Sequence, residues 1–324
     1  MKSPKIRLRR LRENPLVRRL ATENRLEARH LVAPLFVKEG LSKPAPIASM
    51  PGQFQWPLEA SAAEAEKLFS FGVQAVLLFG IPKIKDLAGK QAISSKGVIQ
   101  KAVRITKKRC PKLLVITDVC LCEYLSHGHC GHVKNGKIIN DSSVKFLAEA
   151  ALSHAEAGAD IVAPSDMMDG RVRAIREKLD NRGFQHTPIL SYAVKYASAL
   201  YAPFRDAAEN APSFGDRKSY QMNPANRAEA LREAKMDLEE GADMLLVKPA
   251  LGYEDILFEM KQKFQCPVGA YSVSGEYAMI KAASERGWLD EKKIVLETHL
   301  GMKRAGADFI VTYWAKEISQ WAKQ

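Results

Sequence analysis

Short apolar segments rich in β-branched residues recur along the chain and alternate with amphipathic segments of helical length. This alternation predicts parallel strands connected by helices. We expect eight strands, at residues 31–37, 73–79, 113–119, 160–164, 188–192, 244–247, 268–273 and 309–313. We expect helices at residues 60–71, 98–108, 143–157, 171–181, 225–240, 254–264, 277–286, 291–305 and 315–322.

Eight strand–helix units in 324 residues predict the α/β class and a (β/α)8 TIM barrel. Three expected helices end in the same motif, Ala-Gly-Ala-Asp or Glu-Gly-Ala-Asp, at residues 157–160, 240–243 and 305–308. Glycine favours such junctions because it readily adopts the left-handed conformation that ends a helix. An open doubly wound sheet is the alternative, but residues 34–46 lack the glycine-rich phosphate turn that it would carry.

Positive charge is concentrated at the N-terminus. The formal net charge is +12, and residues 1–30 contain ten Lys and Arg against three Glu. We interpret residues 1–30 as a basic N-terminal arm for subunit assembly and residues 31–324 as the barrel domain. A basic arm can also bind nucleic acid, but this one lacks the interleaved aromatic residues of a single-strand binder. Its few serines and its three acids argue against a mitochondrial transit peptide.

The overall composition is that of a globular protein, with 46% hydrophobic residues. No apolar run approaches the roughly 20 residues that span a bilayer. The N-terminus does not have the pattern of a secretory signal peptide. We therefore expect a cytoplasmic protein with no membrane partner and no nucleic-acid partner. The clustering of three of the five cysteines with histidines favours metal binding over disulfides.

The active site of a TIM barrel lies at the C-terminal ends of its strands. Unusual polar residues follow or end the expected strands at this edge. They are Asp118, Cys120, Ser165, Asp166, Lys195 (just past the fifth strand), Lys248, Ser274 and Tyr313.

A dense group of candidate metal ligands follows the third strand. It consists of Cys120, Cys122, Cys130, His127, His129 and His132. Ligating sulfurs around a tetrahedral zinc lie roughly 3.8 Å apart, which Cys-x-Cys can reach where the chain bends. Three cysteines with an open fourth position would form a catalytic site, whereas a histidine as fourth ligand would close a structural one. The spacing leaves both possibilities open, together with a pocket of free buried cysteines.

Lys195 and Lys248 are the second chemical signal, because each lies at the end of an expected barrel strand. A lysine with its ordinary pKa of about 10.4 is roughly 0.04% free amine at pH 7. Burial, or a second cation, lowers that pKa, so two lysines in one mouth could each lower the other. The predicted chemistry is Schiff-base formation with carbonyl substrates. A single catalytic lysine, or two solvated ones, are the alternatives.

A long polar segment, residues 200–222, separates the fifth strand from the next helix. It is too long for an ordinary strand–helix loop, which predicts an active-site lid. Arg205 and Arg217 within it could bind a substrate carboxylate through paired hydrogen bonds. Surface charge is the alternative interpretation of both arginines.

Taken together, these segments closely resemble those of the porphobilinogen synthase family, also called the 5-aminolevulinate dehydratases. The resemblance extends from about residue 30 to residue 315. The matching segments include DVCLCEYLSHGHCG, NDSSV, AGADIVAPSDMMDGRVRAIR, SYAVKYASALYAPFRDA, DRKSYQM, GADMLLVKPA, YSVSGEYAMI and KRAGAD. The resemblance implies a TIM barrel whose N-terminal arm embraces a neighbour, in a homo-octamer. It also implies a lyase that joins two 5-aminolevulinate molecules, with loss of two waters, into porphobilinogen for haem and other tetrapyrroles.

The resemblance assigns roles to the residues at the barrel mouth. Lys195 and Lys248 would each form a Schiff base, and Lys248 would hold the first substrate molecule. Ser274 and Tyr313 would bind the carboxylate of that molecule. The carboxylate of the second molecule would be bound by Arg205, Arg217 and Gln221. Asp118 and Ser165 would be polar neighbours of the lysines.

The resemblance also implies two metals. Cys120, Cys122 and Cys130 match the ligands of a catalytic zinc, and the softer cysteine set favours zinc over magnesium. The fourth position would take water, hydroxide or the amine of the second substrate. A remote allosteric magnesium would be anchored by Glu233, for which a solvated helix acid is the alternative.

Two positions depart from the family pattern. Ala202 replaces the usual glycine before Pro203, and Asn223 replaces an aspartate. Both lie in or beside the expected lid, so they bear on its closing kinetics more than on the chemistry. Two alternative functions are compatible with part of the sequence. One is a metal-independent, aldolase-type lyase with one Schiff-base lysine, and the other is a nonenzymatic nucleic-acid binder with a zinc knuckle.

Overall fold

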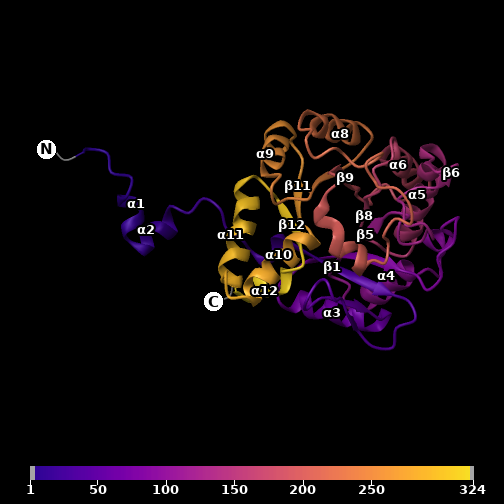
Figure 1. Ribbon diagram of the computed structural model, residues 1–324, viewed down its shortest axis with the longest axis horizontal. Coiled ribbons are helices and arrows are strands. Elements are labelled where there is room, and N and C mark those ends of the chain that lie inside the picture. Colours follow the sequence, from indigo (N-terminus) through magenta and orange to yellow (C-terminus); the bar gives the residue numbers. More distant parts are fainter. Residues whose placement is uncertain (1–3, 322–324) are drawn as a thin grey trace.

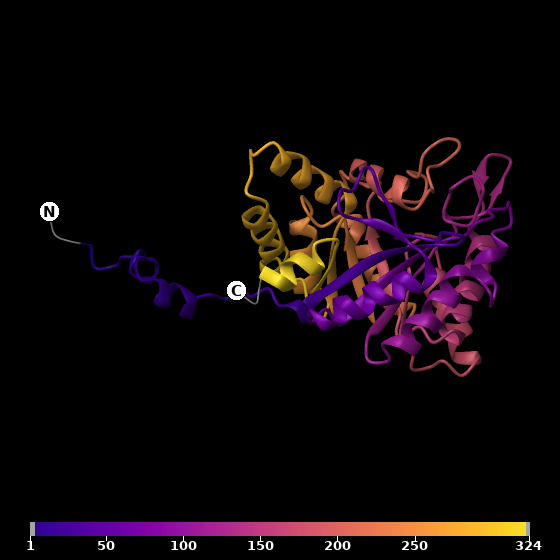
Figure 2. The same ribbon diagram turned by 90° about the horizontal axis from the view of Figure 1, so that it is seen from below.

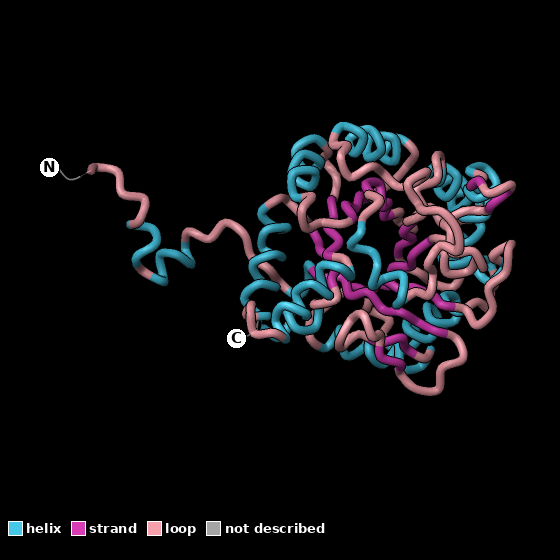
Figure 3. The backbone as a smooth tube through the Cα atoms, viewed as in Figure 1, coloured by secondary structure: helices cyan, strands magenta, loops and turns pink. Residues whose placement is uncertain are grey.

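The structure is a computed structural model that describes residues 4–321. Eight parallel strands form a ring enclosed by helices (Figures 1 and 3). The barrel strands are β1 (Leu31–Lys38), β4 (Ala75–Ile81), β5 (Leu114–Val119), β8 (Ile161–Pro164), β9 (Leu190–Lys195), β10 (Met244–Lys248), β11 (Val268–Ser272) and β12 (Phe309–Thr312). Their hydrogen-bonded order is β8-β5-β4-β1-β12-β11-β10-β9. A parallel bridge between Val162 and Ile189 joins the two ends, so the barrel is nearly closed.

Helices on the outside of the barrel connect successive strands. The long ones are α3 (Leu58–Ser70), α4 (Val98–Arg109), α5 (Asn140–Glu156), α6 (Arg171–Asn181), α8 (Ala228–Glu239), α9 (Glu254–Lys263), α10 (Ser274–Glu285), α11 (Glu291–Arg304) and α12 (Ala315–Trp321). Shorter elements are η1 (Ala28–His30), β2 (Ala45–Pro46), β3 (Phe54–Trp56), η2 (Lys90–Ile93), β6 (Val133–Lys134), β7 (Lys137–Ile138), η3 (Ala199–Tyr201) and α7 (Ala202–Ala207).

The repeated Gly-Ala-Asp motif has two structural roles. Gly158, Gly241 and Gly306 all have positive φ, near 100–110°, and end their helices as the sequence predicts. The aspartate two residues after each glycine accepts a 2.7 Å hydrogen bond from a backbone N–H at or beside the start of a neighbouring strand. The pairs are Asp160 with Val115, Asp243 with Ile189 and Asp308 with Val268. The motif therefore ends a helix and binds a backbone N–H near the start of a neighbouring strand.

The predicted barrel is confirmed, and the differences from prediction are at element ends. The fifth strand runs to Lys195, so this lysine ends β9 and does not lie past it. The helix expected from residue 277 begins at Ser274, directly after β11. The last expected helix is observed to residue 321, and residue 322 lies outside the described part of the chain.

The N-terminal segment projects from the barrel (Figures 1 and 2). It carries two short helices, α1 (Arg10–Glu13) and α2 (Pro15–Leu20), neither of which contains a buried residue. Within residues 4–321, no helix is both long enough and apolar enough to cross a membrane.

Candidate active site

Lys195 and Lys248 are cross-strand neighbours at the C-terminal mouth of the barrel. Lys195 ends β9, Lys248 ends β10, and the two residues are directly paired in the parallel ladder. Neighbouring strands lie about 4.8 Å apart. Both side chains are buried, with 5% and 4% of their surface exposed. The fold therefore brings together the two lysines that the sequence singled out.

A β-bulge directs Lys195 into the barrel. Ser191 pairs with Leu245 and Val194 with Val247, so β9 has one residue more than β10 over this stretch. The Ser191 hydroxyl faces the helix layer and donates to Asp237 of α8 at 2.5 Å. Regular alternation would place residue 195 on that same outer face. The extra residue reverses the alternation, which is a recognised effect of bulges beside active sites.

Lys248 lies in an aromatic cage. Its Nζ is 4.3–5.4 Å from four ring centroids, those of Tyr271, Phe204, Tyr192 and Tyr201. Burial, and next the charge of Lys195, lower the pKa of Lys248 to about 7. A large fraction of this lysine is therefore free amine at neutral pH.

Lys195 has a different environment. Its Nζ donates a hydrogen bond to the backbone carbonyl of Ser165, which directly follows β8. Burial lowers the pKa of Lys195, but the nearby sulfurs of Cys130, Cys120 and Cys122 raise it, and the net direction is upward. The expectation that both lysines have a lowered pKa is therefore wrong for Lys195, whose net shift is upward. This lysine keeps its charge and lowers the pKa of Lys248.

The sulfurs of Cys120, Cys122 and Cys130 form a compact buried group. All three lie within 4.8 Å of one another, and the first two are 3.2 Å apart. Burial raises the pKa of Cys120 and Cys122, whereas hydrogen bonds from those two thiols lower the pKa of Cys130. Three buried sulfurs grouped this closely could hold a metal ion, and thiolates are ligands that zinc favours.

The ring nitrogens of the three nearby histidines contact backbone groups and a tyrosine hydroxyl, not the cysteine sulfurs. The Nδ1 of His127 accepts a hydrogen bond from the His129 backbone N–H at 3.1 Å. The two ring nitrogens of His129 contact the Tyr220 hydroxyl and the Phe214 carbonyl, each at 3.0 Å. His132 Nε2 lies 3.3 Å from the Ala88 carbonyl. Neither candidate ligand group found among residues 4–321 contains a histidine, which disfavours a closed site with a histidine as fourth ligand.

A buried carboxylate beside the cysteines was not expected. Glu123 Oε2 lies 3.2 Å from Cys122 Sγ, and Asn210 Nδ2 donates to Glu123 Oε1 and Cys122 Sγ at 3.0 and 3.1 Å. Asp118 is close by, since its carboxylate, Cys120 Sγ and a Glu123 oxygen lie within 4.8 Å. Burial, and next the charge of Glu123, raise the pKa of Asp118 to about 7. The position of Glu123 directly after Cys122 was the available signal.

A small cavity lies between the lysines, the cysteines and the lid segment, residues 200–222. Its lining residues are Phe79, Cys122, Glu123, Ser165, Lys195, Tyr201, Phe204, Arg217 and Lys248. Its free volume is about 10 Å³, which is room for about one water molecule. A cavity of this size is too small for a carbonyl substrate larger than water, and Tyr201, Phe204 and Arg217 of the segment 200–222 form part of its wall.

Hydrogen bonds fasten the lid segment to the cysteine loop. The buried Arg217 donates through Nη2 to the Gly128 carbonyl of the cysteine loop at 2.8 Å and to the Asn210 carbonyl within the lid segment at 2.7 Å. The Ser213 backbone N–H also donates to the His127 carbonyl at 3.0 Å. Gly128 has a φ of +70°, and a Cβ there would lie 2.5 Å from the Ala211 carbonyl oxygen. Only glycine allows the lid to approach this closely.

The two positions that depart from the family pattern adopt ordinary local structure. Ala202 begins α7 with helical torsion angles, φ −55° and ψ −48°. Asn223 Oδ1 accepts a hydrogen bond from the Ala225 backbone N–H at 3.0 Å, as an aspartate could.

The other expected carboxylate-binding residues do not line this cavity, and Gln221 lines the larger cavity described below. Arg205 is half-buried, and burial, followed by the charge of Arg217, lowers its pKa. The buried Ser274 hydroxyl donates to the Leu200 carbonyl at 3.3 Å. The Tyr313 hydroxyl lies 3.2 Å from that of Tyr271, whose ring borders Lys248. Gln221 is buried, and its Nε2 has no hydrogen-bond partner among the described residues.

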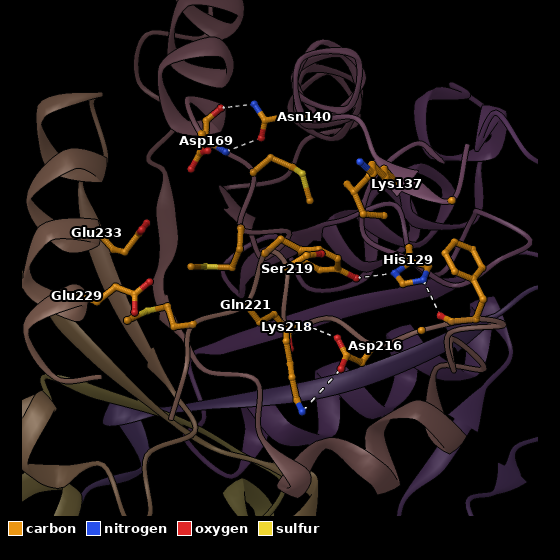
Figure 4. A pocket seen from close by; sticks show the side chains of 18 residues that line it. His129, Lys137, Asn140, Asp169, Asp216, Lys218, Ser219, Gln221, Glu229 and Glu233 are labelled. Atoms are coloured by element: carbon orange, nitrogen blue, oxygen red, sulfur yellow. Dashed lines mark hydrogen bonds and ion pairs between the residues drawn. The ribbon is translucent and has the colours of Figure 1, made fainter. Parts of the chain in front are cut away.

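Glu233 lines a separate and much larger cavity of about 760 Å³, whose wall also includes Asp216, Lys218 and Gln221 of the lid segment (Figure 4). Glu229 and Glu233 extend from α8 into it, and Asp169 and Asp216 contribute two further carboxylates to the lining. Burial, and next the charges of Asp237 and Asp169, raise the pKa of Glu233, which Arg171 opposes. The structure thus separates this residue from the lysines.

Comparison with known proteins agrees with this geometry. The family model described as delta-aminolevulinic acid dehydratase matches residues 5–321. The chain is 54% identical to the enzyme of that name from Halalkalibacterium halodurans over 318 residues, which covers 98% of this chain and 97% of the relative. It is 53% identical to the one from Bacillus subtilis over 315 residues, which covers 97% of each.

A solved structure also matches. The delta-aminolevulinic acid dehydratase (porphobilinogen synthase) of Toxoplasma gondii, in complex with its reaction product porphobilinogen, superposes with a TM-score of 0.96. It is 46% identical, and the match covers 98% of this chain and 92% of that one. The chain therefore belongs to the delta-aminolevulinic acid dehydratase (porphobilinogen synthase) family of lyases.

Proposed function

We propose that the chain condenses two molecules of 5-aminolevulinate into porphobilinogen through Schiff bases on Lys195 and Lys248. The observation that carries this proposal is the direct pairing of two buried lysines at the ends of neighbouring strands. Each substrate molecule has one ketone, so each needs its own lysine amine. This reaction would supply porphobilinogen for the biosynthesis of haem and other tetrapyrroles.

Lys248 is the better nucleophile of the pair and takes the first substrate molecule. Its amine attacks the ketone carbon, a proton passes to the oxygen, and loss of water leaves the Schiff base. A pKa of about 7 supplies free amine at neutral pH. Ser274 and Tyr313 bind the carboxylate of this molecule, and the Tyr271–Tyr313 hydroxyl contact supports this role because Tyr271 also borders the Lys248 amine.

Lys195 takes the second substrate molecule. It has to release its proton before attack, and the buried Asp118, whose pKa is raised to about 7, can accept a proton at the same mouth. Arg205, Arg217 and Gln221 bind the second carboxylate, since all three lie on the lid segment and Arg217 lines the cavity. Opening of the lid admits substrate, and closing then excludes water.

The residues present fit a zinc ion at Cys120, Cys122 and Cys130, because zinc favours buried thiolates in a tetrahedral arrangement. When bound, zinc supplies a Lewis acid that lowers the pKa of a bound water or holds an amine as its free base. Glu123 and Asn210 would not bind the ion themselves, but their contacts with Cys122 Sγ orient that sulfur.

We further propose an allosteric magnesium at Glu233 and a homo-octamer assembled through residues 1–30. Magnesium keeps several water ligands and needs only one or two protein carboxylates, so the roomy cavity beside Glu233 and Glu229 suits it. The arm projects from its own barrel and is free to reach a neighbouring subunit (Figure 2).

Pyrrole formation from 5-aminolevulinate tests the proposed function. Purified protein with zinc and magnesium should form porphobilinogen, a zinc chelator should abolish the activity, and added zinc should restore it. Lys195→Ala and Lys248→Ala should each lower turnover by at least about a thousandfold, because each removes a covalent step. An active Lys195→Ala variant would favour a lyase with one Schiff-base lysine.

A further inference from the structure

Arg171, the first residue of α6, is a fully buried guanidinium behind the Lys195 strand. Its exposed fraction is 2%, and it contacts Asp237 of α8 through two nitrogens, at 2.8 and 3.3 Å. Nη2 also donates to the Ser191 hydroxyl of β9 at 3.2 Å, and Nε lies 3.9 Å from Asp166 Oδ2. Both aspartates are buried. One side chain thus joins α6, α8, β9 and the turn after β8.

Two of these contacts lead directly to Lys195. Ser191 lies at the start of the bulge in β9 that turns Lys195 into the barrel. Asp166 follows Ser165, whose carbonyl accepts the hydrogen bond from the Lys195 amine. Arg171 therefore contacts the segment that directs Lys195 and the residue next to the acceptor of its amine. None of these Arg171 contacts involves Lys248 or another residue of β10.

Stability alone is a poor explanation for this cluster. Taking an Arg and two Asp out of water costs several kcal/mol per ion, and well-packed apolar residues often do as well. What paired hydrogen bonds from a planar guanidinium supply is a fixed geometry. A reacting amine needs such a geometry, because a misplacement of about 1 Å costs roughly a hundredfold in rate.

We propose that Arg171 is a positioning residue for the reaction: it clamps the β9 bulge and the Ser165–Asp166 turn and so holds the Lys195 amine in place for attack. This inference rests on the proposed Schiff-base function. It assigns Arg171 to one of the two lysines only.

The test uses Arg171→Lys in the full-length, zinc-loaded protein, since lysine keeps the charge but loses the paired geometry. Substrate bound to each lysine is trapped with borohydride after short incubation with 5-aminolevulinate and quantified by peptide mass spectrometry. We expect trapping at Lys195 to slow by about 10- to 100-fold and trapping at Lys248 to change by less than about twofold. Arg176→Lys is the matched control, because Arg176 is on the same helix but pairs with Asp180.

Ser191→Ala tests the same contact without disturbing a charge, and it serves if Arg171→Lys fails to fold. It should slow trapping at Lys195 selectively, though less strongly. Unchanged trapping at Lys195 in folded variants, or equal loss at both lysines, would overturn the role of Arg171. Absence of trapping at both lysines in the unmodified protein would instead overturn the proposed function, and the role of Arg171 with it.

Discussion

Lys248 and Lys195 have the same side chain and lie side by side, yet their pKa values shift in opposite directions. Burial and the charge of Lys195 lower the pKa of Lys248, whereas the sulfurs outweigh burial at Lys195. The attacking species is the free amine. The difference therefore predicts an order of reaction: Lys248 reacts first at neutral pH.

The pH dependence of Schiff-base formation at Lys248 checks this order. Because the free-amine fraction rises with pH, the initial rate of trapping should rise about tenfold per pH unit and level off above about pH 7. The rate is measured by rapid mixing at each pH, followed by a reductive quench at one fixed pH. In Lys195→Met the midpoint of this pH profile should move to higher pH, because the charge of Lys195 no longer lowers the pKa of Lys248. A rate still rising toward pH 10 in the unmodified protein would contradict the assignment.

His154 makes a separate prediction about acid stability. It is buried on α5, its Nδ1 lies 3.1 Å from the Thr117 hydroxyl, and burial lowers its pKa to about 3. The unfolded chain takes up a proton near pH 6.5 and the folded chain does not, so stability falls as pH drops from about 6.5 toward 3. At pH 5 the loss from this residue is about 2 kcal/mol.

Urea unfolding at pH 7 and pH 5 measures that loss. The unmodified protein should lose about 2 kcal/mol more than His154→Leu over this interval, because leucine does not titrate. The lost contact to Thr117 affects the variant at both pH values and cancels in the difference. Equal losses in the two proteins would rule out a buried neutral His154.

At the scale of elements, His129 connects the cysteine loop to the lid segment. Its ring contacts Tyr220 and Phe214, and the Tyr220 hydroxyl also accepts the Cys130 backbone N–H at 3.4 Å. His129→Leu should therefore release the lid. Trypsin should then cut after the exposed Lys218 about tenfold faster, as expected for the loss of one or two hydrogen bonds.

The matched control for the lid is His186→Leu, because His186 is exposed on the α6–β9 connection. Cleavage after Lys218 should not change in this control. If His129→Leu were cut no faster than His186→Leu, the His129 contacts would not be what holds the lid segment closed.

The sequence predicted the elements well because their apolar patterns are local. The strand at residues 113–119 and the glycine that ends the helix before residue 160 are properties of a few neighbouring positions. The direction of the Lys195 side chain could not be predicted in this way. Regular strand alternation from Ser191 would place it on the outer face of the barrel, and only the bulge in β9 changes this. The bulge exists only relative to β10, a partner about 50 residues away in sequence.

The same limit applies to the site around the cysteines. Their spacing gave three ligands but could not exclude His127, His129 or His132. The contacts of the His129 and His132 rings are to Tyr220, Phe214 and Ala88, which are 44 to 91 positions away in sequence. The contact between Glu123 and Asn210 joins residues 87 positions apart, and no local pattern signals it.

For the whole molecule, the N-terminal segment predicts self-association. Its large apolar residues are 57–88% exposed, which an isolated subunit would leave in contact with water. They are Ile6, Leu8, Leu11, Leu16 and Leu20. Deletion of residues 1–20 should reduce the molar mass in light scattering from that of the proposed octamer to that of a smaller assembly.

A second variant separates apolar contacts from charge in the arm. Replacement of the same five apolar residues by serine keeps every basic residue and should also give the smaller assembly. An intact octamer after the deletion would contradict the assembly role of the arm. An octamer in the serine variant alone would assign assembly to the basic residues.

The most direct test of the account is to identify which lysines carry substrate. The protein is incubated with 5-aminolevulinate, reduced with borohydride and mapped by peptide mass spectrometry. Two modified peptides are predicted, one containing Lys195 and one containing Lys248, and no other lysine should be modified. Modification of only one of them, or of neither, would contradict a reaction that proceeds through two Schiff bases.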